Sequence, residues 1–200
     1  MARRRKSKGK RGPKAVRVTL GWLEIALGFD EWGRGDPDPA ILLGLVVLEE
    51  GTVSLLSRGL VRPRVPSPYP NDIDGGSKVL VTAKPPRASR LGLLVLALEE
   101  DGGQDVRDLY AMLERPDFTL WSDEGSEPNP RSLSAWLQEP RGVYRVHAIH
   151  GDEDLAERCR SDDWVGAALV VAPTAGEDYR VHTRSADGRN DWTFELRLRV

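Results

Sequence analysis

Apolar runs of strand length recur along the chain, and most are followed by Gly, Pro or acidic residues. Residues 16–20 alternate apolar with polar side chains, which is typical of a strand with one buried face. Residues 41–48 form a continuous apolar run, and residues 49–51 predict a turn into a returning strand at 52–56. Short strands joined by such turns predict a mainly β protein, an antiparallel β-sandwich. Further strands are predicted at residues 78–83, 91–98, 142–149, 165–171, 179–182 and 192–200.

Two segments interrupt the strand pattern with helical signals. Residues 104–114 carry apolar side chains three and four positions apart, and Pro116 ends the predicted helix. Residues 132–138 predict a second short helix. Both helices fall within residues 99–141, which we interpret as an inserted connection inside a single domain that spans residues 15–200.

The positive charge of the chain is concentrated at its start. Residues 1–14 contain eight of the 29 Lys and Arg residues and no acid, which leaves 21 basic and 31 acidic residues in the remainder, a net charge of −10. A basic run without an apolar segment predicts a disordered arm on an acidic body. Composition is compatible with three roles for this arm: binding anionic lipid, binding nucleic acid, or no specific partner.

The composition also bears on the cellular setting. The longest apolar run, residues 41–48, is too short to span a bilayer, and the charged N-terminus lacks the apolar segment of a secretory signal. The single cysteine, Cys159, suits a reducing compartment, and we interpret it as an incidental surface thiol. We therefore expect a cytoplasmic monomer that can associate peripherally with membranes.

Two acidic clusters, far apart in the sequence, each follow a predicted strand. The first occupies residues 30–37, and the second combines residues 152–154 with Asp162 and Asp163. Carboxylates crowded onto neighbouring loops repel one another unless a cation lies between them, and Ca²⁺, which takes about six to eight oxygen ligands, suits such a set. The predicted metal ligands are Asp30, Asp36, Asp152, Asp154 and Asp163.

The two clusters resemble the calcium loops of the C2 domain family. The first loop of that family has two Asp residues, Gly between them and Pro after the second, a pattern that residues 30–37 repeat. The third loop has Asp-x-Asp and then Asp, two apolar residues and Gly, which residues 152–154 and 163–166 match. The interval between these two parts is longer than usual in the family, so either Asp162 or Asp163 can face the ion. The resemblance implies a C2-like sandwich of about eight strands whose loops bind Ca²⁺ and then a membrane or a protein.

We interpret the chain as a non-enzymatic, calcium-dependent module that targets anionic phospholipid membranes. In this hypothesis Ca²⁺ cancels the charge of the acidic loops, and the basic arm adds affinity for the anionic surface. Trp32 lies between candidate ligands, where it can enter lipid headgroups or pack on the edge of the sandwich. The alternative is a metal-independent protein-interaction sandwich with a nucleic-acid-binding basic tail. The predicted lipid-binding residues are Trp32, Arg3, Arg4, Arg5 and Lys6.

Other motifs favour competing interpretations. A metallohydrolase centre is suggested by His147, His150 and Asp152. The two histidines are separated by an odd number of positions, however, which places them on opposite faces of a strand. His182 lies in another predicted strand and has no acidic residue beside it. The acidic run at residues 99–105 can replace the third calcium loop, or it can stabilise the start of the helix that follows.

Overall fold

The fold is mainly β, as the sequence predicts. The computed structural model describes residues 14–27, 38–64, 72–75, 79–86, 89–100, 104–122, 128–159, 164–186, 188 and 190–200. This part of the chain contains thirteen strands and three short helices, and its strands form two antiparallel sheets. The expectation of about eight strands was therefore too low, because several strands of two to five residues carry no clear apolar pattern.

The smaller sheet has five strands, in the order β12, β13, β1 and β4, with β5 also paired to β1. Along β13 every second side chain is buried, so one face meets the core and the other meets solvent. The alternation of apolar and polar residues at the start of β1 has the same cause, namely that one face of the strand is buried. The bounds are β1 Val16–Leu27, β4 Asp72–Asp74, β5 Val79–Ala83, β12 Asp178–Arg184 and β13 Asp191–Arg199.

The larger sheet has eight strands, in the order β3, β2, β6, β11, β9, β7 and β8, with β10 paired to β9. Its central strands β2, β6 and β11 are buried on both faces, which explains their continuous apolar sequences. The bounds are β2 Pro39–Glu49, β3 Thr52–Val61, β6 Arg90–Glu99, β7 Phe118–Ser122, β8 Arg131–Ser132, β9 Gly142–His150, β10 Glu153–Asp154 and β11 Trp164–Val171.

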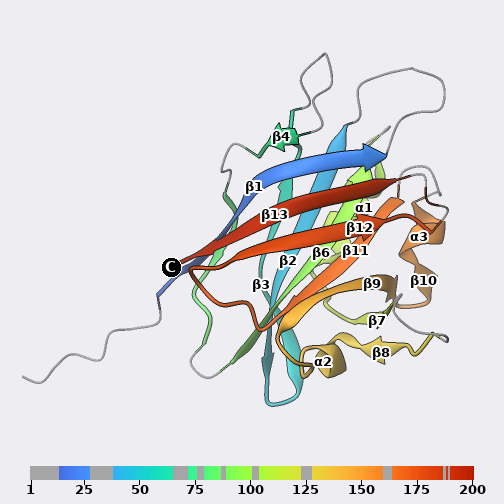
Figure 1. Cartoon of the computed structure of the whole chain (residues 1–200). Helices are drawn as coiled ribbons and strands as arrows, with labels where there is room; N and C mark the ends of the chain where they lie inside the picture. The colour runs from blue at the N-terminus through green and yellow to red at the C-terminus, as the bar shows by residue number, and fades with distance from the viewer. Residues whose placement is uncertain are drawn as a thin grey trace, which may run out of the picture.

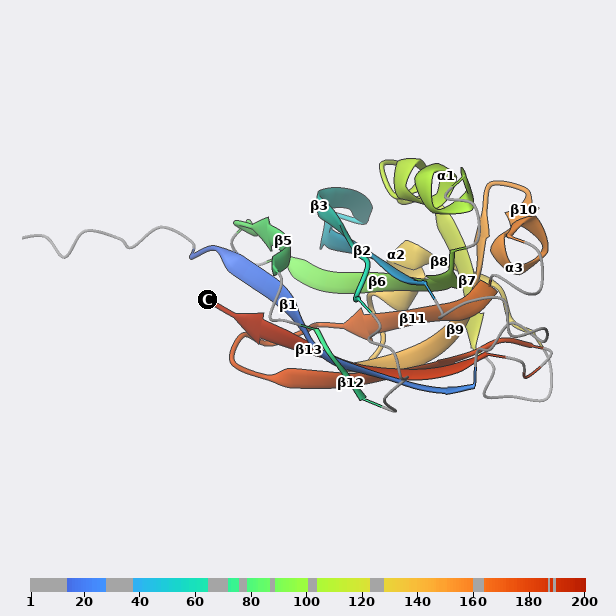
Figure 2. The same cartoon turned by 90° about the horizontal axis from the view of Figure 1, so that it is seen from above.

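The molecule has three layers: the smaller sheet, the larger sheet, and the helices α1 (Gln104–Met112), α2 (Leu133–Trp136) and α3 (Leu155–Arg158) (Figure 2). One core lies between the two sheets, and a second lies between the larger sheet and the helices. Each fully buried Leu contributes about 1.5–3 kcal/mol relative to an exposed one, so both cores are substantial.

The inserted connection between β6 and β9 contributes to both the larger sheet and the helix layer. Within it, β7 pairs with β9, and α1 covers β2 on the helix side of the larger sheet. Cys159 is fully buried in the second core, so the prediction of a surface thiol was wrong. In the described residues no helix is long and apolar enough to cross a membrane.

Candidate functional site

Strand ends from both sheets meet at one end of the sandwich. In the smaller sheet, β13 begins at Asp191. The last residue of β1, Leu27, lies opposite Asp191 on one side, and the last residue of β12, Arg184, lies opposite it on the other. The three strands therefore have these ends together (Figure 1). The side-chain nitrogen Nδ2 of Asn190 donates a hydrogen bond of 3.5 Å to the carbonyl oxygen of Trp164, the first residue of β11. The chain therefore leaves β1 and β12 beside the point where it enters β11.

The larger sheet brings further strand ends to the same place. Pro39 at the start of β2 lies opposite Glu99, and Trp164 lies opposite Leu98. Because β9 runs antiparallel to β11, its last residue, His150, also points to this end. Neighbouring strands are about 4.8 Å apart, so the starts of β2 and β11, which flank β6, are about 10 Å apart. We call this end of the sandwich the acidic end, since the segments that depart from it carry both acidic clusters.

Two of the five predicted metal ligands lie in the described residues. Asp152 occupies the turn between β9 and β10, and it is exposed. Asp154 is half-buried at the start of α3, where its Oδ1 accepts a hydrogen bond of 2.9 Å from the backbone nitrogen of Ala156. The other predicted site residues lie outside the described residues; they are Asp30, Asp36, Asp163, Trp32, Arg3, Arg4, Arg5 and Lys6.

These two carboxylates do not form a metal site by themselves. Among the described residues, no group of three or more His, Cys, Asp or Glu side chains is placed to hold a metal ion. Ca²⁺ takes about six to eight oxygen ligands, whereas Asp152 and Asp154 supply four carboxylate oxygens, one of which already caps α3. A Ca²⁺ site at the acidic end therefore depends on carboxylates outside the described residues.

Other acids near the acidic end are compensated by arginines. Glu100 accepts two hydrogen bonds from Arg62, one of them 2.8 Å long, and this interaction raises the pKa of Arg62 against the opposing effect of burial. Burial acts to lower the pKa of Arg158, but its bonds to Asp108 and Glu153 outweigh that effect and the pKa is raised. Within the acidic run at residues 99–105, Glu100 is thus neutralised by Arg62.

Two other described carboxylates at the acidic end have no such compensation. In the described part of the chain, no hydrogen bond or ion pair joins the side chain of Asp38 or Asp152 to another residue. Both side chains are exposed. Among the described residues neither carboxylate is neutralised, so either can respond to a cation.

The histidines have separate partners. His147 stacks on Trp121 with the ring centroids 4.9 Å apart, whereas the Nε2 atom of His150 lies 2.7 Å from Asp117 Oδ1 on the other face of β9. The predicted opposite orientation is confirmed. His182 does have an acidic partner: its Nε2 atom lies 2.7 Å from Asp191 Oδ1, because antiparallel pairing brings β13 beside β12.

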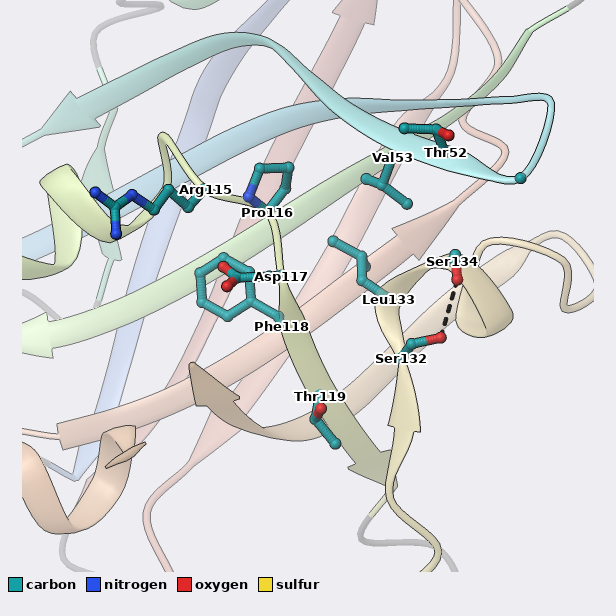
Figure 3. A pocket seen from close by; sticks show the side chains of 11 residues that line it. Thr52, Val53, Arg115, Pro116, Asp117, Phe118, Thr119, Ser132, Leu133 and Ser134 are labelled. Carbon is teal, nitrogen blue, oxygen red and sulfur yellow. Dashed lines mark hydrogen bonds between the residues drawn. The ribbon is translucent and has the colours of Figure 1, made fainter. Parts of the chain in front are cut away.

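A pocket of about 650 Å³ lies on the helix side of the larger sheet, between the β2–β3 turn, the α1–β7 connection and α2 (Figure 3). Three of its polar side chains already serve the fold: Asp117 pairs with His150, and Ser132 caps α2 and forms a hydrogen bond of 2.9 Å with Ser134. Sequence reasoning missed this pocket because its lining comes from three separated segments. Its remaining lining residues are Gly51, Thr52, Val53, Arg115, Pro116, Phe118, Thr119 and Leu133.

No protein-family model matches this chain, and no curated protein matches it in sequence. The fold and the acidic end define a β-sandwich of two antiparallel sheets, with helices over the larger sheet and an acid-rich set of connections at one end.

Proposed function

We propose that this chain is a non-enzymatic binding module that uses Ca²⁺ at its acidic end to attach to anionic phospholipid. The observation that supports the proposal is the convergence of strand ends. The chain leaves β1 at Leu27 and enters β2 at Pro39, and it leaves β9 at His150 and enters β11 at Trp164; these four strand ends lie at the acidic end, and the two acidic clusters lie between them in the sequence. Sequence positions more than a hundred residues apart can then contribute oxygens to one ion.

The mechanism is electrostatic. Without metal, the carboxylates of the acidic end repel an anionic surface, and each exposed acid there, such as Asp38 and Asp152, adds to the repulsion. Ca²⁺ bound among them cancels this charge and, where its coordination is incomplete, takes phosphate oxygens as further ligands. Binding therefore requires both the ion and the anionic surface.

The basic arm enters β1 at the opposite end from the acidic loops. β1 has twelve residues, which at about 3.3 Å per residue places its start about 36 Å from the acidic end. The arm precedes Val16, and its fourteen residues span at most about 50 Å when extended. That length is sufficient for cations of the arm to reach a surface that the acidic end contacts, where each contributes about 1 kcal/mol.

Co-sedimentation with vesicles tests the proposal. Vesicles of phosphatidylcholine alone and vesicles with added phosphatidylserine are each offered with Ca²⁺ and with chelator. We expect binding in one of the four conditions, anionic vesicles with Ca²⁺. Equal binding in all four conditions, or none in any, would refute membrane targeting. Binding to anionic vesicles that persists in chelator would assign the attachment to the arm alone.

A further inference from the structure

The larger sheet extends beyond the smaller one on the side of β12. Among the described strands, β12 pairs with β13 on one edge and with none on the other. Beneath it, β12 contacts β11 and β9, whereas β7 and β8 lie farther out and are not covered by the smaller sheet (Figure 1). The inner face of the larger sheet thus continues past the free edge of β12 as a ledge.

The ledge is built from side chains whose orientation follows from the strand register. Val170 belongs to the core between the sheets and lies opposite Val143, so Val143 faces the same side. Side chains alternate between the two faces of a strand, so every second residue of β9 from Val143 onward faces this side, together with the β7 residues that lie opposite. The members of the ledge are Thr119, Trp121, Val143, Arg145, His147 and Ile149.

Among the described residues, no strand or helix covers the apolar members of the ledge. Val143 is 38% exposed, one of the few large apolar side chains exposed in the described part of the chain. Trp121 and Ile149 are half-buried and belong to neither hydrophobic core. An added strand beside β12 would cover these three side chains in the way that β12 itself covers β11.

The free edge of β12 presents unpaired backbone groups next to positive charge. Its inward side chains, Tyr179, Val181 and Thr183, are buried, and its outward ones alternate with them. Arg180 and Arg184 have 70% and 52% of their side chains exposed. The Arg180 guanidinium lies 5.5 Å from the centroid of the Trp22 ring and 3.8 Å from Glu24, both on β1, and Arg184 lies 3.9 Å from Asp191 on β13. An edge strand of this kind is a template for another extended segment.

We infer that the β12 edge binds an extended segment of a partner protein in which acidic and apolar residues alternate. Backbone hydrogen bonds to β12 supply affinity, as in other strand-addition complexes. The acidic side chains then lie beside Arg180 and Arg184, and opposite charges on neighbouring strands stabilise the pair by about 0.2–1 kcal/mol each. The apolar side chains lie over Val143, Ile149 and Trp121.

Charge argues against a second copy of this chain as the occupant. Antiparallel pairing of two β12 strands about His182 would place Arg180 of one copy opposite Arg184 of the other, twice in each dimer. Cations placed directly opposite each other are destabilising. The basic arm is excluded for the same reason, because it would bring Lys and Arg to an edge that already carries Arg.

Peptide binding in chelator tests the inference independently of Ca²⁺. The probes are fluorescein-labelled peptides of four Glu-Val repeats, four Lys-Val repeats, and a block peptide with the Glu-Val composition but no alternation. We expect the Glu-Val repeat to bind at least about tenfold more tightly than either control, measured by fluorescence anisotropy. Hydrogen exchange should show that amides of β12 become protected when this peptide is bound.

Charge reversal makes the test specific. The double variant Arg180→Glu, Arg184→Glu should exchange the preference, so that the Lys-Val peptide binds more tightly than the Glu-Val peptide. The matched control is Arg107→Glu, on the exposed face of α1 in the helix layer, which should leave the preference unchanged. Equal affinity for all peptides, or binding that leaves the β12 amides unprotected, would overturn the inference. A dimer that forms through β12, detected by sedimentation velocity, would also overturn it.

Discussion

The indole nitrogen of Trp136 donates a hydrogen bond to the carbonyl oxygen of Leu120, and these two buried atoms lie 2.9 Å apart. The bond joins α2 to β7 on the helix side of the larger sheet. The Trp136 ring also meets the Arg131 guanidinium, 4.4 Å from the ring centroid, and packs edge-on against Tyr144. A single side chain therefore attaches α2 to the outer strands of the larger sheet.

Replacing Trp136 by Phe should cost more stability than the same change at Trp192. Trp192 is also buried, but its indole nitrogen has no hydrogen-bond partner in the part of the chain that the structure describes. Both changes remove the same atoms, so the difference between the two losses of unfolding free energy reports on the hydrogen bond to Leu120. We expect Trp136→Phe to lower the free energy of unfolding by about 1–2 kcal/mol more than Trp192→Phe, measured by urea denaturation. Equal losses would mean that lost volume, and not the bond, determines the effect.

Gly59 should tolerate no side chain. A Cβ atom there would lie 2.0 Å from the carbonyl oxygen of Leu80, because β3 passes directly against the backbone of β5. We expect Gly59→Ala to lower the free energy of unfolding by at least about 2 kcal/mol, since the obstacle is backbone and cannot rotate away. Gly142→Ala is the matched control, because the atoms nearest its Cβ belong to the Tyr144 side chain, at 3.3 Å or more. Comparable losses in the two variants would contradict this interpretation.

The long strands could be predicted from sequence because their apolar runs are local signals. Residues 41–48 became β2, and residues 165–171 became β11. The second core was missed although its signal was present: strands that are apolar at every position are buried on both faces, which requires a covering layer. β7 was missed because it is five residues long and is stabilised by pairing with β9, about thirty residues later.

The candidate site was predictable only in outline. The structure places the strand ends that flank the two clusters at one end of the sandwich, which the metal hypothesis requires. It also gives Asp154 a second role, as the cap of α3, for which Asp154 followed by Glu157 three residues later was an available signal. The pocket and the β12 ledge depend on pairing between distant strands, which no local pattern encodes.

Ca²⁺ should raise the melting temperature of the protein. An ion that binds only the folded state stabilises it by mass action, and Mg²⁺, which gives up its waters reluctantly, should do so far less. Asp152→Asn should reduce the Ca²⁺-dependent rise while leaving the apo melting temperature unchanged or slightly higher, because Asp152 is exposed and has no partner among the described residues. Differential scanning fluorimetry with Ca²⁺, Mg²⁺ and chelator measures both effects. A melting curve that Ca²⁺ leaves unchanged would refute the metal site.

Two variants at Asp154 separate its structural role from metal binding. Asn caps helices about as well as Asp, so Asp154→Asn should preserve apo stability and weaken only the response to Ca²⁺. Asp154→Ala removes the bond to Ala156 and should cost about 1 kcal/mol without metal. If Asp154→Asn responds to Ca²⁺ as the unmodified protein does, this carboxylate serves only as a cap.

Deleting residues 2–14 should leave the fold intact and weaken attachment to anionic vesicles. β1 begins at Val16, and the deleted segment contributes eight cations but no large apolar side chain, so the melting temperature should fall by less than about 2 °C. At fixed Ca²⁺, the shortened chain should bind phosphatidylserine vesicles more weakly. The difference should shrink as salt rises, since charges are screened beyond about 10 Å at 0.1 M ionic strength. Replacing the eight cations by Gln in the full-length chain is the control for length, and it should reproduce the deletion. A large loss of thermal stability would show instead that the arm contributes to the folded body.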